Sequence, residues 1–190
     1  VGIVWLHSLV GHTEFAHGGI ASALGEGQAG ALKAIFLLLI AGVGVKAALV
    51  PLHGWLPQAM VAPAPVSALL HAVAVVKAGA FGIVRIAYEI YGIEFAQSLG
   101  LLLPLAVLAA VTILWGSLRA LFQDDLKKRL AYSTVSQVSY IALGVALFGP
   151  LGTIGGLAHL GHQDVTQNTL LFSAGNYAEM WNAAAEAAVP

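Results

Sequence analysis

A succession of apolar segments, each about 20 residues long, most limits how this chain can fold. A segment of that length can cross the hydrocarbon core of a bilayer only as a helix, because every backbone polar group must be satisfied internally. Only 9% of the residues are charged and 59% are hydrophobic, whereas soluble domains are about 25% charged. The sequence therefore predicts an all-α, polytopic membrane helix bundle. The expected spans are residues 29–50, 66–91, 99–122, 130–148 and 151–174.

The spans and the segments between them form one membrane domain, residues 1–190. We expect a partial helix over residues 1–10, a glycine-rich extramembrane loop over 11–28, a membrane core over 29–179 and a tail over 180–190. Because the chain starts inside an apolar segment, we interpret it as a fragment of a longer polytopic protein. A proline-rich segment, residues 51–65, cannot be one straight helix and suits the membrane interface.

Basic residues indicate the orientation. Lys127, Lys128 and Arg129 follow the third span, and the positive-inside rule places them in the cytoplasm. The proline-rich segment then lies on the same side, and the turn at residues 91–97 is external. We expect a multi-pass protein of a bacterial plasma membrane in contact with membrane lipids. No basic patch with interleaved aromatic residues suggests nucleic acid as a partner.

Lys77 is the residue that a membrane helix tolerates least. It lies near the middle of the apolar run 65–90, about 18 Å of helix rise from Pro65. A charge at that depth costs roughly 2.5–3.5 kcal/mol on insertion scales. Lysines near helix ends can extend to the interface, but Lys77 is too deep to do so easily. We therefore expect a role in moving charge.

Two further ionisable residues share this region. Lys46 lies only about 7.5 Å of helix rise from Pro51, so extension to the interface and a functional role both remain open. Gly42 and Gly44 suggest a bent or locally unwound helix before it. His71 lies about 120° around a regular helix from Lys77, so the two share a face only if the helix contains a bulge. Histidine is a natural proton relay, and a neutral histidine bonded to a neighbouring helix is the alternative.

The last span carries a polar face. His159 and His162 are spaced i,i+3, and Gln163, Asp164 and Gln167 follow them. Such a face should line a hydrated cavity or the protein interior. Two histidines at this spacing could hold a metal, but no third ligand is evident, so we predict a possible relay and no metal or cofactor. Elsewhere, Arg85 and Glu89 are spaced i,i+4 and should form an ion pair.

Three stretches resemble the proton-conducting membrane transporter family. They are KAALVPLHGWLPQAMVAPAPVSALLHAVAVVKAG, DDLKKRLAYSTVSQVSY and, in degraded form, HLGHQDVTQNTLLFSAGNYAE. This family contains the antiporter-like subunits of respiratory complex I, the Mrp cation/proton antiporters and the membrane-bound hydrogenases. The first stretch is most similar to the Mrp D-subunit type. The resemblance implies that the membrane core is the central part of an antiporter-like fold.

The resemblance also implies site residues. Lys46 matches a proton-path lysine, and His71 and Lys77 match relay residues on the following helix. A later polar motif of the family, with two histidines, a glutamine and a lysine, matches His159, His162 and Gln163, while Gln167 stands at its lysine. The family's essential glutamate belongs to an upstream helix that this sequence does not include.

These features together predict a function. We expect a subunit that translocates protons within a multisubunit membrane complex, with exchange for Na⁺ as an open alternative. A second alternative is a complex I-type NADH:quinone oxidoreductase or hydrogenase subunit, with no redox site of its own. A third is an inactive scaffolding homologue, which Gln167 favours because glutamine cannot carry a proton as lysine does.

Overall fold

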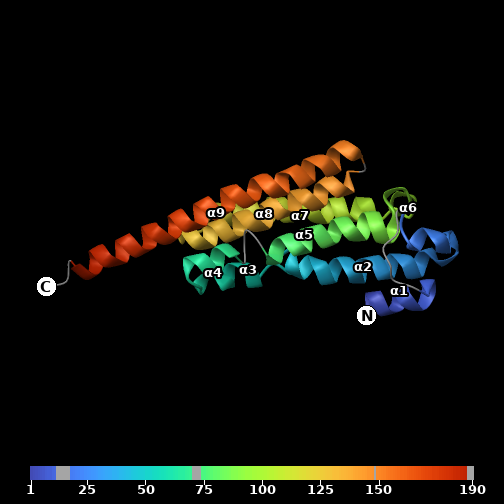
Figure 1. Ribbon diagram of the computed structural model, residues 1–190, viewed down its shortest axis with the longest axis horizontal. Helices are drawn as coiled ribbons and strands as arrows, with labels where there is room; N and C mark the ends of the chain where they lie inside the picture. Colours follow the sequence, from blue (N-terminus) through green and yellow to red (C-terminus); the bar gives the residue numbers. More distant parts are fainter. Residues whose placement is uncertain (12–17, 70–73, 148, 188–190) are drawn as a thin grey trace.

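The computed structural model describes residues 1–11, 18–69, 74–147 and 149–187. Within these ranges the chain is built from helices and turns without a β-strand, which confirms the all-α prediction (Figure 1). The elements are α1 (Gly2–Val10), η1 (Ala21–Leu24), η2 (Glu26–Gln28), α2 (Ala29–Lys46), α3 (Trp55–Gln58), η3 (Ala59–Val61), α4 (Ala64–Ala68), α5 (Val75–Arg85), the π-helical η5 (Ile86–Tyr91), α6 (Ile93–Ser98), α7 (Leu102–Leu121), α8 (Leu126–Ala146) and α9 (Pro150–Ala187).

The long helices run side by side and form an elongated bundle (Figure 1). Helix α8 packs against α7 on one side and α9 on the other, and α5 joins this group to α2. The short helices α3 and α4 lie at the end of the bundle where α8 begins, and α6 lies at the opposite end. Helix α4 also packs against α9, so the proline-rich segment folds back onto the last helix.

Apolar side chains fill the centre of the bundle and also cover part of its outer surface. Leu32, Ile83 and Ile141 are buried, whereas Leu103 and Leu114 on α7 are 73% and 65% exposed. Helices α2 and α7 are long and apolar enough to cross a membrane. An outward-facing apolar surface on helices of this length is what lipid contact requires.

Helix α2 differs from its prediction in two ways. It remains α-helical through Gly42 and Gly44, so the local unwinding that was one of the two predicted alternatives before Lys46 is wrong. It also ends at Lys46, four residues before the predicted boundary, because the chain then turns: Ala48 has φ 55° and the Leu49 N–H donates to the Gly44 carbonyl at 2.9 Å.

The predicted span 66–91 is not one regular helix. Helix α4 ends at Ala68 and α5 begins at Val75. On either side of residues 70–73, which lie outside the described ranges, the Ala74 N–H donates to the Leu69 carbonyl at 2.9 Å. Lys77 is therefore in the first turn of α5 rather than in the middle of a long helix.

Helices α8 and α9 are longer than predicted. Asp125 caps α8 by accepting from the Lys127 N–H at 2.8 Å, so the helix starts four residues earlier. Within α8, the Ser136 hydroxyl lies 2.9 Å from the Ser117 hydroxyl of α7, so this polar side chain serves the packing of the two helices. Helix α9 continues to Ala187, so the segment expected as a tail is helical as far as that residue.

Candidate functional site

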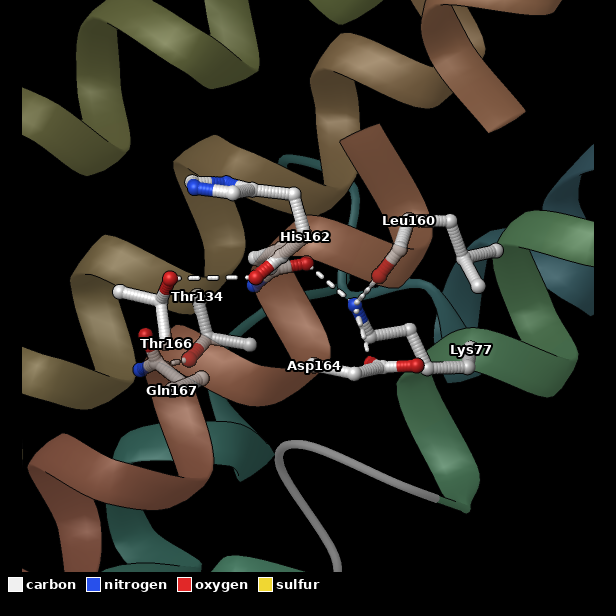
Figure 2. A network of polar contacts seen from close by, with 8 residues as sticks. Lys77, Thr134, Leu160, His162, Asp164, Thr166 and Gln167 are labelled. Atoms are coloured by element: carbon white, nitrogen blue, oxygen red, sulfur yellow. Dashed lines mark hydrogen bonds and ion pairs between the residues drawn. The ribbon is translucent and has the colours of Figure 1, made fainter. Parts of the chain in front are cut away.

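The site is centred on the Lys77 ammonium, which is buried between α5 and α9. Lys77 is 5% exposed, and its side chain extends away from α5 towards the middle of α9 (Figure 2). Its Nζ lies 2.8 Å from Oδ1 of Asp164 and also donates to the Gln163 side-chain oxygen. A third, longer contact joins Nζ to the Leu160 carbonyl at 3.4 Å. Of the three N–H donors of the ammonium, two have hydrogen-bond acceptors on Gln163 and Leu160, and the Asp164 carboxylate supplies the counter-charge without an aligned hydrogen bond at Oδ1 among the described residues.

One turn of α9 supplies all three acceptors. Leu160, Gln163 and Asp164 are spaced i, i+3 and i+4, which places them on one face of a helix. The Asp164 side chain is 33% exposed, whereas the Lys77 side chain is 6% exposed. The ion pair therefore has a buried positive end and a negative end that solvent or another protein surface can reach.

The same face of α9 continues to Gln167, one turn further along. Gln167 is 3% exposed, and its side-chain N–H₂ donates to the Thr134 hydroxyl at 2.6 Å (Figure 2). It also donates to the Leu130 carbonyl at 2.9 Å. Both acceptors lie on α8. At the predicted lysine position, a neutral amide thus joins two helices.

The two histidines of α9 lie close to this face, in the turn before Asp164. His159 is half-buried, with its ring 5.6 Å from Tyr140 and 6.5 Å from the ring of His162. Its Nε2 is buried and has no hydrogen-bond partner among the described residues. An open pocket of about 440 Å³ is lined by His159 together with Gln137, Tyr140, Gly155 and Gly156. Water occupies about 30 Å³ per molecule in the liquid, so the pocket has room for several.

The backbone of Lys46, at the end of α2, lies near this site. A Cβ at Gly79 would come within 2.3 Å of the Ala47 nitrogen and 2.7 Å of the Lys46 carbonyl carbon. The end of α2 thus packs directly against α5, two residues beyond Lys77. The Lys46 side chain itself is exposed. His71, the remaining predicted relay residue, lies outside the described residues.

The carboxylate of Asp164 is the functional group that sequence reasoning missed. The polar face of the last span was predicted, but not the contact between Lys77 and a residue 87 positions later. A charge count could have indicated it: Glu89 and Asp164 are the two acidic residues in the predicted spans. Glu89 pairs with Arg85, as predicted. Asp164 therefore remained as the counter-ion for a buried lysine.

Comparisons with known proteins agree with the family resemblance of the sequence. A family model described as NADH:quinone oxidoreductase/Mrp antiporter, TM, matches residues 1–185. NADH-quinone oxidoreductase subunit N of Desulforudis audaxviator is 41% identical over 144 residues, which are 73% of this chain and 28% of that protein. A probable K(+)/H(+) antiporter protein of Rhizobium meliloti is 37% identical over 142 residues, covering 74% of this chain and 14% of that protein.

A solved structure shows the same fold. In the Mrp complex from Dietzia sp. DQ12-45-1b, one chain superposes with a TM-score of 0.79 and 30% sequence identity, covering 92% of this chain and 31% of its own length. The chain thus spans less than a third of the length of each of these relatives.

Proposed function

The chain belongs to the NADH:quinone oxidoreductase/Mrp antiporter transmembrane family, and from this membership we propose that it translocates protons as an antiporter-like subunit of a multisubunit membrane complex. Membership of this family makes it an integral membrane protein. We further propose a bacterial plasma membrane as its location, with membrane lipids, protons and neighbouring subunits as its partners.

One observation carries the proposal: a buried ammonium is joined to a partly exposed carboxylate inside an apolar helix bundle. Ionisable groups are expensive in a membrane protein, and where they occur they mark pathways for ions and protons. Replacing such a pair with apolar residues often stabilises a protein, so a requirement for stability alone does not explain it.

In mechanism, Lys77 is the central proton carrier. It releases a proton to an acceptor within reach and is reprotonated from the other side of the path. His159 lines a pocket that has room for water, and water there can connect the buried groups to a surface. Lys46, His71 and His162 extend this path as further relay residues. The free energy comes from an ion gradient or from electron transfer in partner subunits. One elementary charge crossing 100 mV is worth about 2.3 kcal/mol.

Exchange of protons for Na⁺ and redox-coupled pumping are both compatible with this site, because each requires the same buried carriers. Of the two similar proteins, one is described as part of an NADH-quinone oxidoreductase and the other as part of a probable K(+)/H(+) antiporter. We propose proton movement as the shared step. A Na⁺ gradient that drives proton flux without an electron donor would assign the chain to the exchangers.

The test is proton flux in vesicles containing the complete complex. We expect Lys77→Ala to lower the initial rate by at least about 100-fold, the scale of a lost proton-transfer group. Lys46→Ala should also lower it. Lys33→Ala is the matched control, because Lys33 is an exposed lysine on the same helix as Lys46 and has no place in the proposed path.

The amount of complex in the membrane is measured for each variant, so that loss of assembly is not mistaken for loss of transport. Wild-type flux in the Lys77→Ala variant at normal assembly would refute the relay role of Lys77. It would also favour the scaffolding alternative.

A further inference from the structure

We propose that Asp164 is a proton-accepting residue of the path, taking the proton directly from Lys77 and passing it towards the surface of α9. This inference rests on the proposed function, because it names the acceptor of the same relay. No motif of the family resemblance assigns a role to Asp164.

The contact is short enough for direct transfer. Nζ of Lys77 and Oδ1 of Asp164 form an ion pair at 2.8 Å, within the 2.6–3.2 Å reach of proton transfer, although Oδ1 accepts no aligned hydrogen bond among the described residues. Proton-transfer contacts are often poorly aligned before the reaction, and rotation of the ammonium or of the carboxyl group aligns this one. In the transfer, one N–H bond of the ammonium breaks and an O–H bond forms on the carboxylate. The products are a neutral amine and a neutral carboxylic acid, so charge balances without another reactant.

The groups around Lys77 and Asp164 can accommodate both the charged pair and the neutral pair. In the charged state, the ammonium also donates to the Gln163 oxygen and lies near the Leu160 carbonyl. In the neutral state, the carboxylic acid can donate its proton back or outward, since it has gained an O–H donor. A buried charge pair is costly to maintain, and a neutral pair in the same place removes that cost. The two states therefore differ little enough for exchange.

Exposure gives the transfer a direction. The Lys77 side chain is 6% exposed and the Asp164 side chain 33% exposed. Oδ1 is itself buried, so a proton accepted there leaves through the exposed remainder of the Asp164 side chain, at the surface of α9. There, water or a neighbouring subunit can accept it.

Asp164 also resolves the break in the predicted path. Gln167 occupies the position of the expected lysine, and its N–H₂ group donates hydrogen bonds to two acceptors of α8. It cannot accept a proton at neutral pH. Asp164 lies three residues earlier on the same helix, and it is a titratable group in direct contact with Lys77. The path therefore leaves α9 at Asp164 rather than continuing to Gln167.

The experiment compares proton flux in vesicles containing the complete complex with variants at this position. Asp164→Asn keeps an oxygen acceptor for Lys77 but cannot be protonated, and it should lower the flux by at least about 100-fold. Asp164→Glu keeps the acid and should retain most of the flux. Glu89→Gln is the matched control: it also removes a carboxylate from an ion pair, the one with Arg85, outside the path.

Infrared difference spectroscopy adds a measurement that a purely structural role would not change. In wild-type protein labelled with ¹³C-aspartate, driving proton flux should produce an isotope-shifted carboxylic-acid band. Asp124 and Asp125, the other two aspartates, are exposed outside the bundle. The shifted band should disappear in Asp164→Glu while flux continues. This test stands even if Asp164→Asn fails to assemble.

The outcomes separate the two proposals. If Lys77→Ala abolishes flux while Asp164→Asn transports normally and the labelled band is absent, the proposed function stands and the role of Asp164 is refuted. If the wild-type complex moves no protons, both proposals fail together. Loss of flux in Asp164→Asn, retention in Asp164→Glu and a labelled band in wild type support the inference.

Discussion

At the level of single residues, Lys77 and Gln167 use the polar face of α9 for different purposes. Lys77 brings a charge to it from α5, and Asp164 compensates that charge. Gln167 belongs to the face itself and reaches across to α8 with two neutral hydrogen bonds. The first interaction can change its protonation state and the second cannot. The proposed transport role therefore belongs to the Lys77–Asp164 pair, and we expect Gln167 to contribute stability.

Replacing Gln167 tests this division. Gln167→Leu removes both inter-helix hydrogen bonds, each worth roughly 0.6–2 kcal/mol in membrane proteins. We expect a lower melting temperature of the detergent-solubilised protein and an unchanged proton flux per assembled complex. Thr166→Val is the control, because Thr166 is exposed on the same helix and its hydroxyl bonds only to the His162 carbonyl of that helix. Loss of flux without loss of stability would instead place Gln167 on the path.

At the level of elements, the sequence predicts the spans better than their interruptions. Helices α7 and α8 lie close to their predicted ranges, because long apolar runs have few other options in a membrane. The junction between α4 and α5 was not predictable, since residues 66–76 are largely apolar and contain neither glycine nor proline. The sequence also does not predict Asp164 as the partner of Lys77, because a contact between α5 and α9 depends on packing between distant segments.

The contact between α2 and α5 leads to a prediction about Gly79. A Cβ there would meet backbone atoms of Ala47 at 2.3 Å and 2.8 Å, and backbone cannot move aside as a side chain can. Gly79→Ala should therefore separate the two helices and cost about 1–3 kcal/mol, the usual range for overpacking. It should also reduce proton flux, because the ends of the helices that carry Lys46 and Lys77 meet at this point.

Gly42→Ala provides the comparison. Gly42 lies inside α2, and a Cβ added to it would meet nothing within 4 Å. Alanine in a helix interior is favoured over glycine by about 1 kcal/mol. This variant should melt at the same temperature as wild type or slightly higher, with unchanged flux. Equal melting temperatures for Gly79→Ala and Gly42→Ala would show that the α2–α5 contact is looser than the structure indicates.

At the level of the whole molecule, α9 is longer than a membrane is thick. Its 38 residues extend about 57 Å, against about 30 Å for the hydrocarbon core. Its C-terminal part projects beyond the other helices (Figure 1). A pocket lined by Asp124, Lys127, Tyr177 and Trp181 shows that the beginning of this projection lies beside the α7–α8 turn. If the positive-inside rule holds for Lys127 and its neighbours, this end of the bundle is cytoplasmic.

Single-cysteine labelling tests this orientation, and the chain suits it because it has no cysteine of its own. An impermeant maleimide should label Trp181→Cys and Asp124→Cys only in inverted vesicles, and Glu94→Cys on α6 only in intact cells. Leu114→Cys should stay unlabelled in both, since Leu114 is exposed on an apolar face that lipid covers. Labelling of Trp181→Cys and Asp124→Cys from opposite sides would contradict the packing of α9 beside the α7–α8 turn. The reverse pattern at all three sites would keep the fold but invert it in the membrane, and the path from Lys77 through Asp164 would then open towards the opposite compartment.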